Sequence, residues 1–463
     1  MNFHIAVICM RDDGTEGRRD VLTVTKEQLV METLGLTVAE GKALLAHVQA
    51  AVVDEQAATY LDQHRPCETC GTPHRGKDPR QSTVNTVFGP IAVPNPRWHR
   101  CVCQNTGSRT FRPTAQWLTG QTSPELLYLE PKWGSLVAYA KVVELLADVL
   151  PVAKTMRAET VRRHVHATAN RIEQALGDER ETLFDGSEED WAAQPTSDGP
   201  MTVGLDGGFV RARRKAGFFE VIAGKSIVAF KREEAEDTPS AKRFAFVQTY
   251  GTKPRRRLWE LMKSQGLQEN QEVLFLSDGG ETVRTPQAYL HPSSEHYLDW
   301  FHVTMRLTVM TQQNKALIEE DVSLGTDVRD TLESVKHYLW HGNVEAALER
   351  IERLLFELDL RKIRSPAIAK LSRSVTEFET YVQNNHAFIP NFGECYRQGD
   401  RISTAFVEST VNQVISKRFV KKQQMQWTPE GAHLLLQTRT RVLNGDLDAI
   451  FRDWYPQFRQ AAA

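Results

Sequence analysis

The sequence has no apolar run approaching the roughly 20 residues that a membrane-spanning helix needs. Its first ten residues have neither the basic start nor the small-residue cleavage site of a secretory signal, so we expect a cytoplasmic protein with no membrane partner. The net charge is only -2, which excludes a strongly basic protein that binds polyanions through its overall field. The remaining composition, 41% hydrophobic and 25% charged over 463 residues, is that of a soluble protein with several domains.

Cysteine is scarce, with six in the chain, but four lie close together in sequence. They form two pairs: Cys67 and Cys70, then Cys101 and Cys103. Two cysteines separated by two residues and followed by a glycine, as Cys67 and Cys70 are, direct both thiolates at one ion, and strand-like stretches separate the pairs. The pattern predicts a structural zinc ribbon over residues 65–110, with three histidines able to replace one ligand: His64, His74 and His99. A disulfide pair, which a cytoplasmic protein disfavours, and unrelated buried thiols are the alternatives.

The segments on either side of this cluster have other patterns. Residues 1–64 predict a hairpin and then a helix that begins at a Thr37–Glu40 capping box. Residues 120–185 predict a helical domain with two successive helices, and Pro151 ends the first of them. The first helix has an apolar face made by Val142, Leu145, Leu146 and Val149. The second carries Arg162 and Arg163 on its polar face, so the pair fits a DNA-binding helix-turn-helix or an ordinary helical hairpin. Residues 186–200 are acidic and rich in turn residues, as in a linker.

From residue 201 the order of elements changes to strands followed by alternating helices and strands. We expect strands at 202–206, 218–224 and 244–250, a helix at 255–265, and strands at 273–277 and 296–300. Three antiparallel strands followed by helix–strand alternation is the plan of an α/β ribonuclease H-like core, whose first part we place at 201–310. Asp206 and Asp278 each follow an apolar run and precede two glycines, so they are expected at strand ends where open sheets bind ligands. A lone aspartate at such a place is otherwise a turn residue or a helix cap.

A third acid, Glu408, begins an apolar-periodic helical segment, and Asn412 follows one turn later on the same face. Three carboxylates brought together would hold two Mg²⁺ or Mn²⁺ ions, because hard divalent cations prefer carboxylate oxygens. Two such ions activate an attacking oxygen and stabilise the leaving oxygen in phosphodiester chemistry. The sequence therefore predicts a metal site formed by Asp206, Asp278 and Glu408.

Four sequence blocks resemble those of bacterial insertion-sequence transposases of the DDE class, and most closely the ISKra group. They are Gly204–Gly208, Ser277–Gly280, Asp299-Trp-Phe-His302, and Glu408–Asn412 with the residues that follow. The resemblance covers nearly the whole chain, and the last block is its most specific part. It implies that Asp206, Asp278 and Glu408 are the catalytic triad and that Asp299 and His302 lie near the active site. It also implies DNA cleavage by water and strand transfer by a 3′-hydroxyl.

The spacing of the acids supports this resemblance. Asp206 and Asp278 are 72 residues apart, which accommodates three strands and a helix, whereas Asp278 and Glu408 are 130 apart. The excess at 311–400 has a strong helical period and predicts an all-helical insertion, which several DDE transposases contain. Residues 401–463 are then assigned to the final catalytic helix and C-terminal helices. Some DDE enzymes have a basic residue seven positions after the glutamate, but here that residue is Ile415.

Local basic clusters flank the proposed active-site elements and predict a DNA-binding track. With the helical pair they make this set of candidate contacts: Arg162, Arg163, Arg213, Arg214, Lys215, Arg255, Arg256, Arg257, Lys417, Arg418, Lys421 and Lys422. We predict a nucleoid-associated transposase that binds double-stranded transposon ends and target DNA as a homodimer or larger assembly. A domesticated DNA-binding protein without catalysis, and a ribonuclease H-like nuclease for junctions or hybrids, are the alternatives.

Overall fold

The computed structural model describes residues 1–11, 14–104, 108–180, 199–213, 217–228, 240–268, 271–280, 294–360, 365–420 and 425–459. The chain forms two compact units. The first contains Met1–Thr168 together with Asp446–Ala463, and the second contains Ala169–Gly445. Most of the acidic linker predicted at 186–200 lies outside the described residues.

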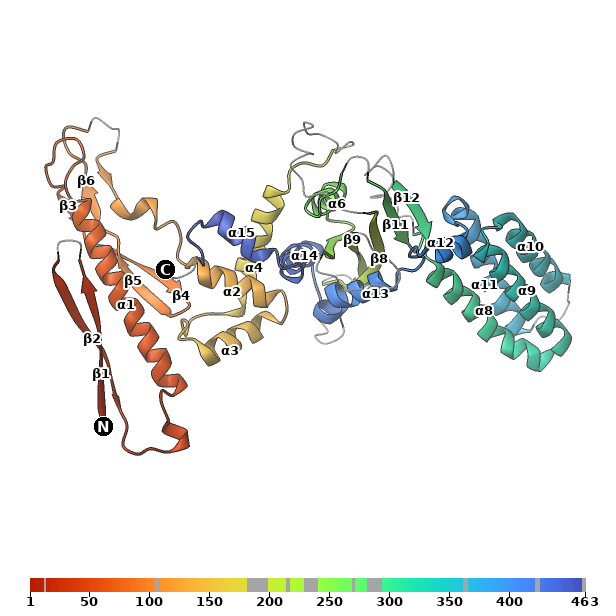
Figure 1. Cartoon of the computed structure of the whole chain (residues 1–463), viewed down its shortest axis with the longest axis horizontal. Coiled ribbons are helices and arrows are strands. Elements are labelled where there is room, and N and C mark those ends of the chain that lie inside the picture. The colour runs from red at the N-terminus through yellow and green to blue at the C-terminus, as the bar shows by residue number, and fades with distance from the viewer. Residues whose placement is uncertain are drawn as a thin grey trace. The chain divides into compact units, whose positions relative to one another are not determined.

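The first unit begins with a long antiparallel hairpin and a long helix (Figure 1). Strands β1 (Asn2–Met10) and β2 (Glu16–Thr25) are followed by a short 3₁₀ turn (Met31–Thr33) and by α1 (Val38–Gln63). The predicted capping box is present, because the Thr37 side chain accepts the N–H of Glu40 and the Glu40 carboxylate accepts the N–H of Thr37. The stretch Met31–Gln63 is the one helical segment of the described chain that is long and apolar enough to cross a membrane, a property that core helices of soluble proteins share.

Small strands follow, and they form two separate sheets. The strands are β3 (Gly76–Asp78), β4 (Gln81–Thr86), β5 (Gly89–Pro94), β6 (Arg97–His99) and β7 (Thr110–Phe111). Strands β4 and β5 pair as a hairpin, while β3, β6 and β7 make a three-stranded sheet in that order. A 3₁₀ turn at Pro113–Gln116 leads on to the helices of this unit.

The helical part of the first unit contains α2 (Pro124–Gly134), α3 (Tyr139–Val149) and the first part of α4 (Ala158–Ala175). Helix α3 ends two residues before Pro151, as predicted. The predicted apolar face of α3 is only half correct: Val142 and Leu146 are fully buried, but Leu145 and Val149 are 36% and 58% exposed. Val142 and Leu146 are four residues apart, so they lie on the same narrow face of the helix, and it is this face that is buried.

The last helix of the chain, α15 (Leu447–Trp454), belongs to the first unit. The Tyr128 hydroxyl donates to Asp448 Oδ2 at 2.7 Å, and Phe451 packs edge-on against the Tyr128 ring. The C-terminal helices predicted within 401–463 are thus divided between the two units, and the residues after Gly445 belong to the first, where this aromatic cluster binds α15 to α2.

The second unit contains a mixed five-stranded sheet with the order β10-β9-β8-β11-β12. The strands are β8 (Met201–Arg211), β9 (Phe218–Val228), β10 (Lys242–Val247), β11 (Val273–Ser277) and β12 (Ser294–Leu298), and α6 (Pro254–Lys263) lies between β10 and β11. Strands β8, β9 and β10 are antiparallel, whereas β11 runs parallel to both β8 and β12. Each of these elements occurs where the sequence predicts it, but the helix expected between β11 and β12 lies outside the described residues.

A helical bundle follows β12, as the periodicity at 311–400 predicts (Figure 1). Its helices are α8 (Trp300–Glu320), α9 (Val322–Trp340), α10 (Val344–Leu360) and α11 (Pro366–Asn384), followed by a 3₁₀ turn (His386–Phe388) and α12 (Phe392–Gln398). Buried residues from all four long helices form one continuous core, including Val335, Ile351 and Val375. Trp300 packs against Trp340 and Phe392 at the base of this core, so it serves packing.

The chain then returns to the sheet through α13 (Ala405–Val411), which continues into a π-helix (Asn412–Val420) and later α14 (Pro429–Leu443). Helix α13 lies directly on β8, because Gly204 has no side chain. A Cβ atom on Gly204 would come within 1.9 Å of Val407 Cγ2 and 2.7 Å of Phe406 Cζ. The contact places the segment that carries Glu408 against the strand that carries Asp206.

Candidate metal centres

The register of the parallel strands brings three aspartates into line. Leu205 of β8 pairs with Ser277 of β11, and Ser277 pairs in turn with Leu298 of β12. The next residues along these strands are Asp206, Asp278 and Asp299. Strand β8 continues to Arg211, so Asp206 is not at the end of its strand as predicted; it lies where its parallel partner ends. All three acids therefore meet at the carboxyl edge of the parallel part of the sheet.

Asp206, Asp278 and His302 form a group with the geometry to hold a metal ion. Each offers one ligand atom, these atoms all lie within 4.8 Å of one another, and all three residues are half-buried. Burial and the negative charge of Asp278 raise the pKa of Asp206 to about 6. Burial alone would lower the pKa of His302, but the negative charges of Asp299, Asp278 and Asp206 raise it. A bound cation would displace these protons and offset the repulsion between the carboxylates.

Asp299 is fully buried and connects two helices behind this group. As the N-cap of α8, it accepts the N–H of Phe301 at 2.8 Å, and its Oδ2 lies 2.6 Å from Nδ1 of His302. It also accepts the N–H of Thr404 at 3.1 Å and the hydroxyl of Thr404, the residue that precedes α13. A ligand atom of His302 lies within 4.8 Å of those of Asp206 and Asp278, and Asp299 contacts His302, so both residues lie near the predicted aspartates; their supporting role in catalysis stays a prediction.

The helical bundle supports the turn that carries Asp278. Tyr381 of α11 donates a hydrogen bond to the main-chain oxygen of Asp278 at 3.0 Å. Gly279 has a left-handed φ of +81°, and a Cβ there would lie 2.4 Å from Asn385 Oδ1. The guanidinium of Arg306, one turn after His302 on α8, lies 4.2 Å from the centre of the Tyr381 ring. Two of the three potential ligands, Asp278 and His302, are thus positioned by the bundle.

Glu408 is exposed and is not among the residues whose ligand atoms lie within 4.8 Å of one another. It lies in the first turn of α13, between the buried pair Phe406–Val407 and the start of the π-helix at Asn412. Its assignment as a metal ligand stays a prediction, as does the supporting role of Asn412. Ile415 fills the space beside Gly208, where a Cβ would come within 2.7 Å of Ile415 Cδ1, so a basic residue could not occupy this position without repacking.

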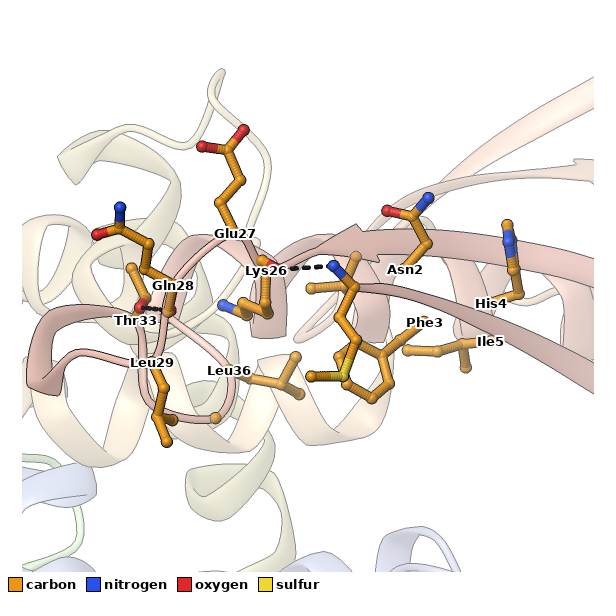
Figure 2. Close-up of a pocket in the computed structure, with 13 residues that line it drawn as sticks. Asn2, Phe3, His4, Ile5, Lys26, Glu27, Gln28, Leu29, Thr33 and Leu36 are labelled. Atoms are coloured by element: carbon orange, nitrogen blue, oxygen red, sulfur yellow. Dashed lines mark hydrogen bonds between the residues drawn. The ribbon is translucent and has the colours of Figure 1, made fainter.

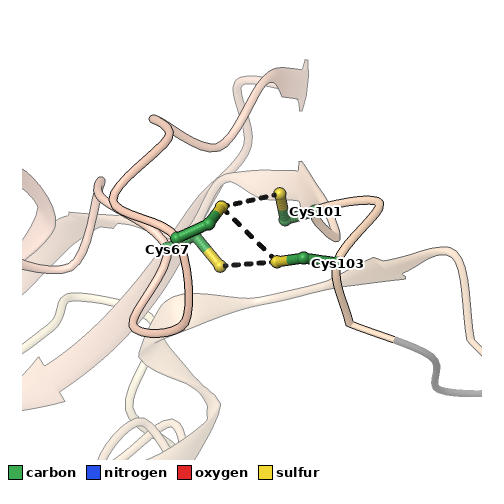
Figure 3. Close-up of side chains that lie close together, drawn as sticks. Cys67, Cys101 and Cys103 are labelled. Atoms are coloured by element: carbon green, nitrogen blue, oxygen red, sulfur yellow. Dashed lines mark hydrogen bonds between the residues drawn. The ribbon is translucent and has the colours of Figure 1, made fainter.

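The four clustered cysteines form a second group (Figure 3). The Sγ atoms of Cys67 and Cys103 are 3.5 Å apart, and those of Cys70 and Cys101 are 3.3 Å apart. These separations are too long for disulfides and suit thiolates that surround one ion. The neighbouring thiols Cys101 and Cys70 raise the pKa of Cys103 to about 12, so a cation is needed before all four thiols ionise together.

The nearby histidines take no part in this cluster. His74 Nδ1 lies 3.0 Å from the main-chain oxygen of His99, and His64 stacks on Tyr60 while its Nδ1 lies 2.8 Å from the Tyr60 oxygen. The four cysteines alone make the group.

Of the twelve residues predicted to contact DNA, the structure describes eight, and these are exposed, half-buried or buried. Arg163, Arg213 and Lys417 are exposed, while Arg162, Arg255 and Arg256 are half-buried, and two of these form ion pairs, Arg162 with Glu159 and Arg256 with Glu260. The prediction is wrong for Arg257 and Arg418, which are 5% and 0% exposed and cannot reach a phosphate. Arg257 instead pairs with Glu173 at 2.6 Å, and Arg418 lies over the buried Trp427 ring. Arg214, Lys215, Lys421 and Lys422 lie outside the described residues.

We call the group of Asp206, Asp278 and His302 the Asp206 centre. Three residues that support it were not predicted from the sequence: Thr404, Tyr381 and Arg306. Thr404 and Tyr381 reach the centre across more than a hundred residues of sequence, so no local pattern marks them. The sequence gives a weak indication for Arg306, because it follows His302 by four residues and therefore lies on the same helix face.

The first unit also contains a cavity of about 660 Å³ between the hairpin and the segment that leads to α1. Figure 2 shows its lining, which includes the apolar side chains of Phe3, Ile5 and Leu36 and the charged residues Lys26 and Glu27. None of the predicted catalytic or cysteine ligands lines it.

No protein-family model matches this chain, and no curated protein matches it. Among solved structures, the chain has a weak likeness to a structure titled "Crystal structure of NurA", with 12% sequence identity over 56% of this chain and 74% of that chain. The TM-score of 0.11 is too low to establish a common fold.

Proposed function

We propose that this chain is a DNA transposase with a ribonuclease H-like core, which cleaves DNA at the ends of its element and joins the 3′-hydroxyl to a target. One observation carries the proposal: the parallel register sets Asp206 and Asp278 side by side at the edge of the sheet. Two adjacent carboxylates at such an edge are the minimal holder for divalent ions in phosphodiester chemistry.

The side chains present fit hard divalent cations. Ligand oxygens of Asp206 and Asp278 lie within 4.8 Å of each other, and burial together with the charge of Asp278 raises the pKa of Asp206 to about 6, so a cation would stabilise the ionised pair. When bound, two Mg²⁺ or Mn²⁺ ions activate the attacking oxygen and stabilise the leaving oxygen. Asp206 is held by its place in β8, which pairs with β9 and β11. Asp278 directly follows β11, and the hydrogen bond from Tyr381 to its main-chain oxygen holds it there.

Glu408 is the third carboxylate in this proposal. Its helix α13 is held against β8 by the Gly204 contact and at its first turn by the Asp299–Thr404 hydrogen bonds. These contacts hold the main chain of the segment, whereas the Glu408 side chain is exposed. In this proposal the side chain turns toward the centre when metal and DNA bind.

The four cysteines support a structural zinc ion in the first unit, since tetrahedral thiolate sites are the usual form of such a centre. The exposed cations Arg163, Arg213 and Lys417 support double-stranded DNA as the partner. Synapsis of two DNA ends requires at least a homodimer in the reaction.

The test uses a labelled duplex that carries the inverted repeats flanking the gene, incubated with protein and Mg²⁺ or Mn²⁺. We expect nicking at the repeat end followed by joining, with Asp206→Asn, Asp278→Asn and Glu408→Gln each reducing cleavage at least 10³-fold because a metal-binding carboxylate is lost. Asp453→Asn, an exposed acid on α15, is the matched control and should react as the unaltered chain does.

The outcomes separate the proposal from its alternatives. Cleavage without joining and without preference for the repeats indicates a ribonuclease H-like nuclease. Binding to the repeats without cleavage at any metal concentration indicates a DNA-binding protein that has lost catalysis. Equal cleavage by all variants places the activity outside this centre and overturns the mechanism.

A further inference from the structure

The Asp206 centre differs from an all-carboxylate site in one respect: an imidazole takes part in it. His302 lies in the first turn of α8, which directly follows β12, and one of its ring nitrogens lies within 4.8 Å of ligand atoms of both Asp206 and Asp278. Glu408, the third acid of the sequence, is outside this group. The third ligand position that is formed before DNA binds therefore belongs to a nitrogen donor.

The tautomer of His302 is set by the residue behind it. Nδ1 lies 2.6 Å from Asp299 Oδ2, and a carboxylate can only accept, so Nδ1 carries the hydrogen. The neutral ring then keeps the lone pair of Nε2 available to bind a cation. A carboxylate behind a histidine is the usual arrangement around metal-bound imidazole, because it fixes the ring and makes the other nitrogen a better ligand.

Asp299 is itself held firmly. It is 0% exposed, and its two oxygens accept from Phe301, Thr404 and His302. A buried carboxylate with every oxygen engaged has one orientation, so His302 is preorganised for one position.

We propose that His302 binds the divalent ion through Nε2, and that this nitrogen ligand makes the centre prefer Mn²⁺ to Mg²⁺. Imidazole suits transition metals, whereas Mg²⁺ prefers a shell made of oxygens. Asp299 is a positioning residue in this scheme, and Thr404 holds Asp299 while it starts the helix of Glu408. The inference rests on the metal-dependent chemistry proposed above and adds the identity of one ligand and of the preferred metal.

The test measures metal binding to the full chain without DNA. Free Mn²⁺ is counted by its electron paramagnetic resonance signal, and Mg²⁺ affinity is obtained by competition. We expect His302→Ala to weaken Mn²⁺ binding 10- to 100-fold while changing Mg²⁺ binding less than threefold, and Asp299→Asn to weaken Mn²⁺ binding at least 10-fold. His386→Ala, a half-exposed histidine on the same unit, is the control and should bind both ions as the unaltered chain does.

A spectroscopic readout identifies the ligand directly. Electron spin echo modulation of bound Mn²⁺ should show a coordinated imidazole nitrogen in the unaltered chain and in His386→Ala, and this signal should vanish in His302→Ala. Thr404→Ser, which keeps the hydroxyl donor, should retain Mn²⁺ affinity, whereas Thr404→Val should lower it.

The outcomes distinguish this inference from the proposed function. If Asp206→Asn abolishes Mn²⁺ binding but His302→Ala leaves the affinity and the nitrogen signal unchanged, His302 is not a ligand while the carboxylate centre stands. If the unaltered chain binds Mn²⁺ no more tightly than Mg²⁺, the metal preference is overturned. If neither ion binds to the unaltered chain at millimolar concentration, both the inference and the metal-dependent function fail.

Discussion

Tyr381 donates a hydrogen bond to the main-chain oxygen of Asp278, 3.0 Å away and 103 residues earlier in the chain. Burial raises the pKa of the Tyr381 hydroxyl, so it remains a donor at every pH the protein would meet. The bond ties the helical bundle to the turn that carries a proposed catalytic carboxylate, although Tyr381 comes from α11, the last of the four long helices along the chain.

We expect Tyr381→Phe to lower the rate of DNA cleavage about 10-fold, because the Asp278 turn loses its anchor, while the free energy of unfolding falls by only about 1 kcal/mol. Single-turnover cleavage and urea unfolding measure the two effects. Tyr338→Phe, at a half-buried residue packed against the core of the same bundle, should leave cleavage unchanged. Equal loss of rate in both variants would show that the effect is general to the bundle.

Gly204→Ala should destabilise the second unit by about 3 kcal/mol, because the added Cβ would meet Val407 Cγ2 at 1.9 Å. Urea unfolding measures the loss. The double variant Gly204→Ala with Val407→Ala removes the closest clashing atom and leaves the contact with Phe406 Cζ, so it should be more stable than the sum of the two single changes predicts. Strict additivity would mean that the two residues do not meet.

Stability should fall in acid through a cluster formed by Glu173, Arg257 and His433. Burial alone raises the pKa of Glu173, but hydrogen bonds with His433 and Arg257 and their charges lower it to about 2. A carboxyl group whose pKa is lower in the folded than in the unfolded chain stabilises the fold at pH values above its ordinary pKa of 4.5. This contribution is lost as the pH falls toward 2. Burial lowers the pKa of His433, so its contribution is also lost as pH falls below about 6.5.

The measurement for this cluster is urea unfolding at pH 7, 5, 4 and 3. Glu173→Gln should lower the free energy of unfolding by about 2–3 kcal/mol at pH 7 and make the remaining dependence on pH between 5 and 3 shallower. Glu349→Gln, a change on the exposed side of α10, is the control. An equally steep acid limb in Glu173→Gln would contradict the assignment of the depressed pKa to this residue.

The purified chain should contain one zinc ion, which a thiol-blocking mercurial releases. Cys103→Ser should lose this zinc and destabilise the first unit, because a structural zinc site contributes directly to folding. Cys9→Ser alters a half-buried thiol in the same unit that is outside the cluster, and it should keep the zinc. Zinc content by mass spectrometry decides the matter; retention in Cys103→Ser would rule out the four-cysteine site.

Lys417 and Arg418 are adjacent but should respond differently to removal of charge. Lys417 is exposed, so Lys417→Ala should weaken DNA binding and reduce the slope of log affinity against log salt by about 0.9, with stability unchanged. Arg418 is buried over Trp427, so Arg418→Ala should lower stability by about 2 kcal/mol or more. Filter binding across a salt series and thermal unfolding separate the two roles.

Much of the sheet could be predicted because each strand is a short apolar run bounded by turn residues, and Asp206 and Asp278 stood out as the acids that follow such runs. The bundle was also predictable, since Leu332 and Val335 keep one face over several turns. Local periodicity does not report long-range pairing, however, so it could not show that Thr404 meets Asp299 or that Tyr381 meets Asp278. The same limit explains why Arg257 and Arg418 were mistaken for surface cations: a basic run looks alike whether or not another element covers it.

The two ends of the helical bundle meet. The main-chain N–H of Trp300 donates to the oxygen of Ile402 at 3.0 Å, and Asp299 holds Thr404 beside it. The chain therefore leaves the sheet and re-enters it at one point, and the entropy of closing such an excursion grows only slowly with its length. Helices can therefore be added to or deleted from the end of the bundle away from the sheet at little cost to the stability of the sheet. A different domain could be grafted at this junction, provided that Tyr381 or an equivalent donor to the Asp278 turn is kept.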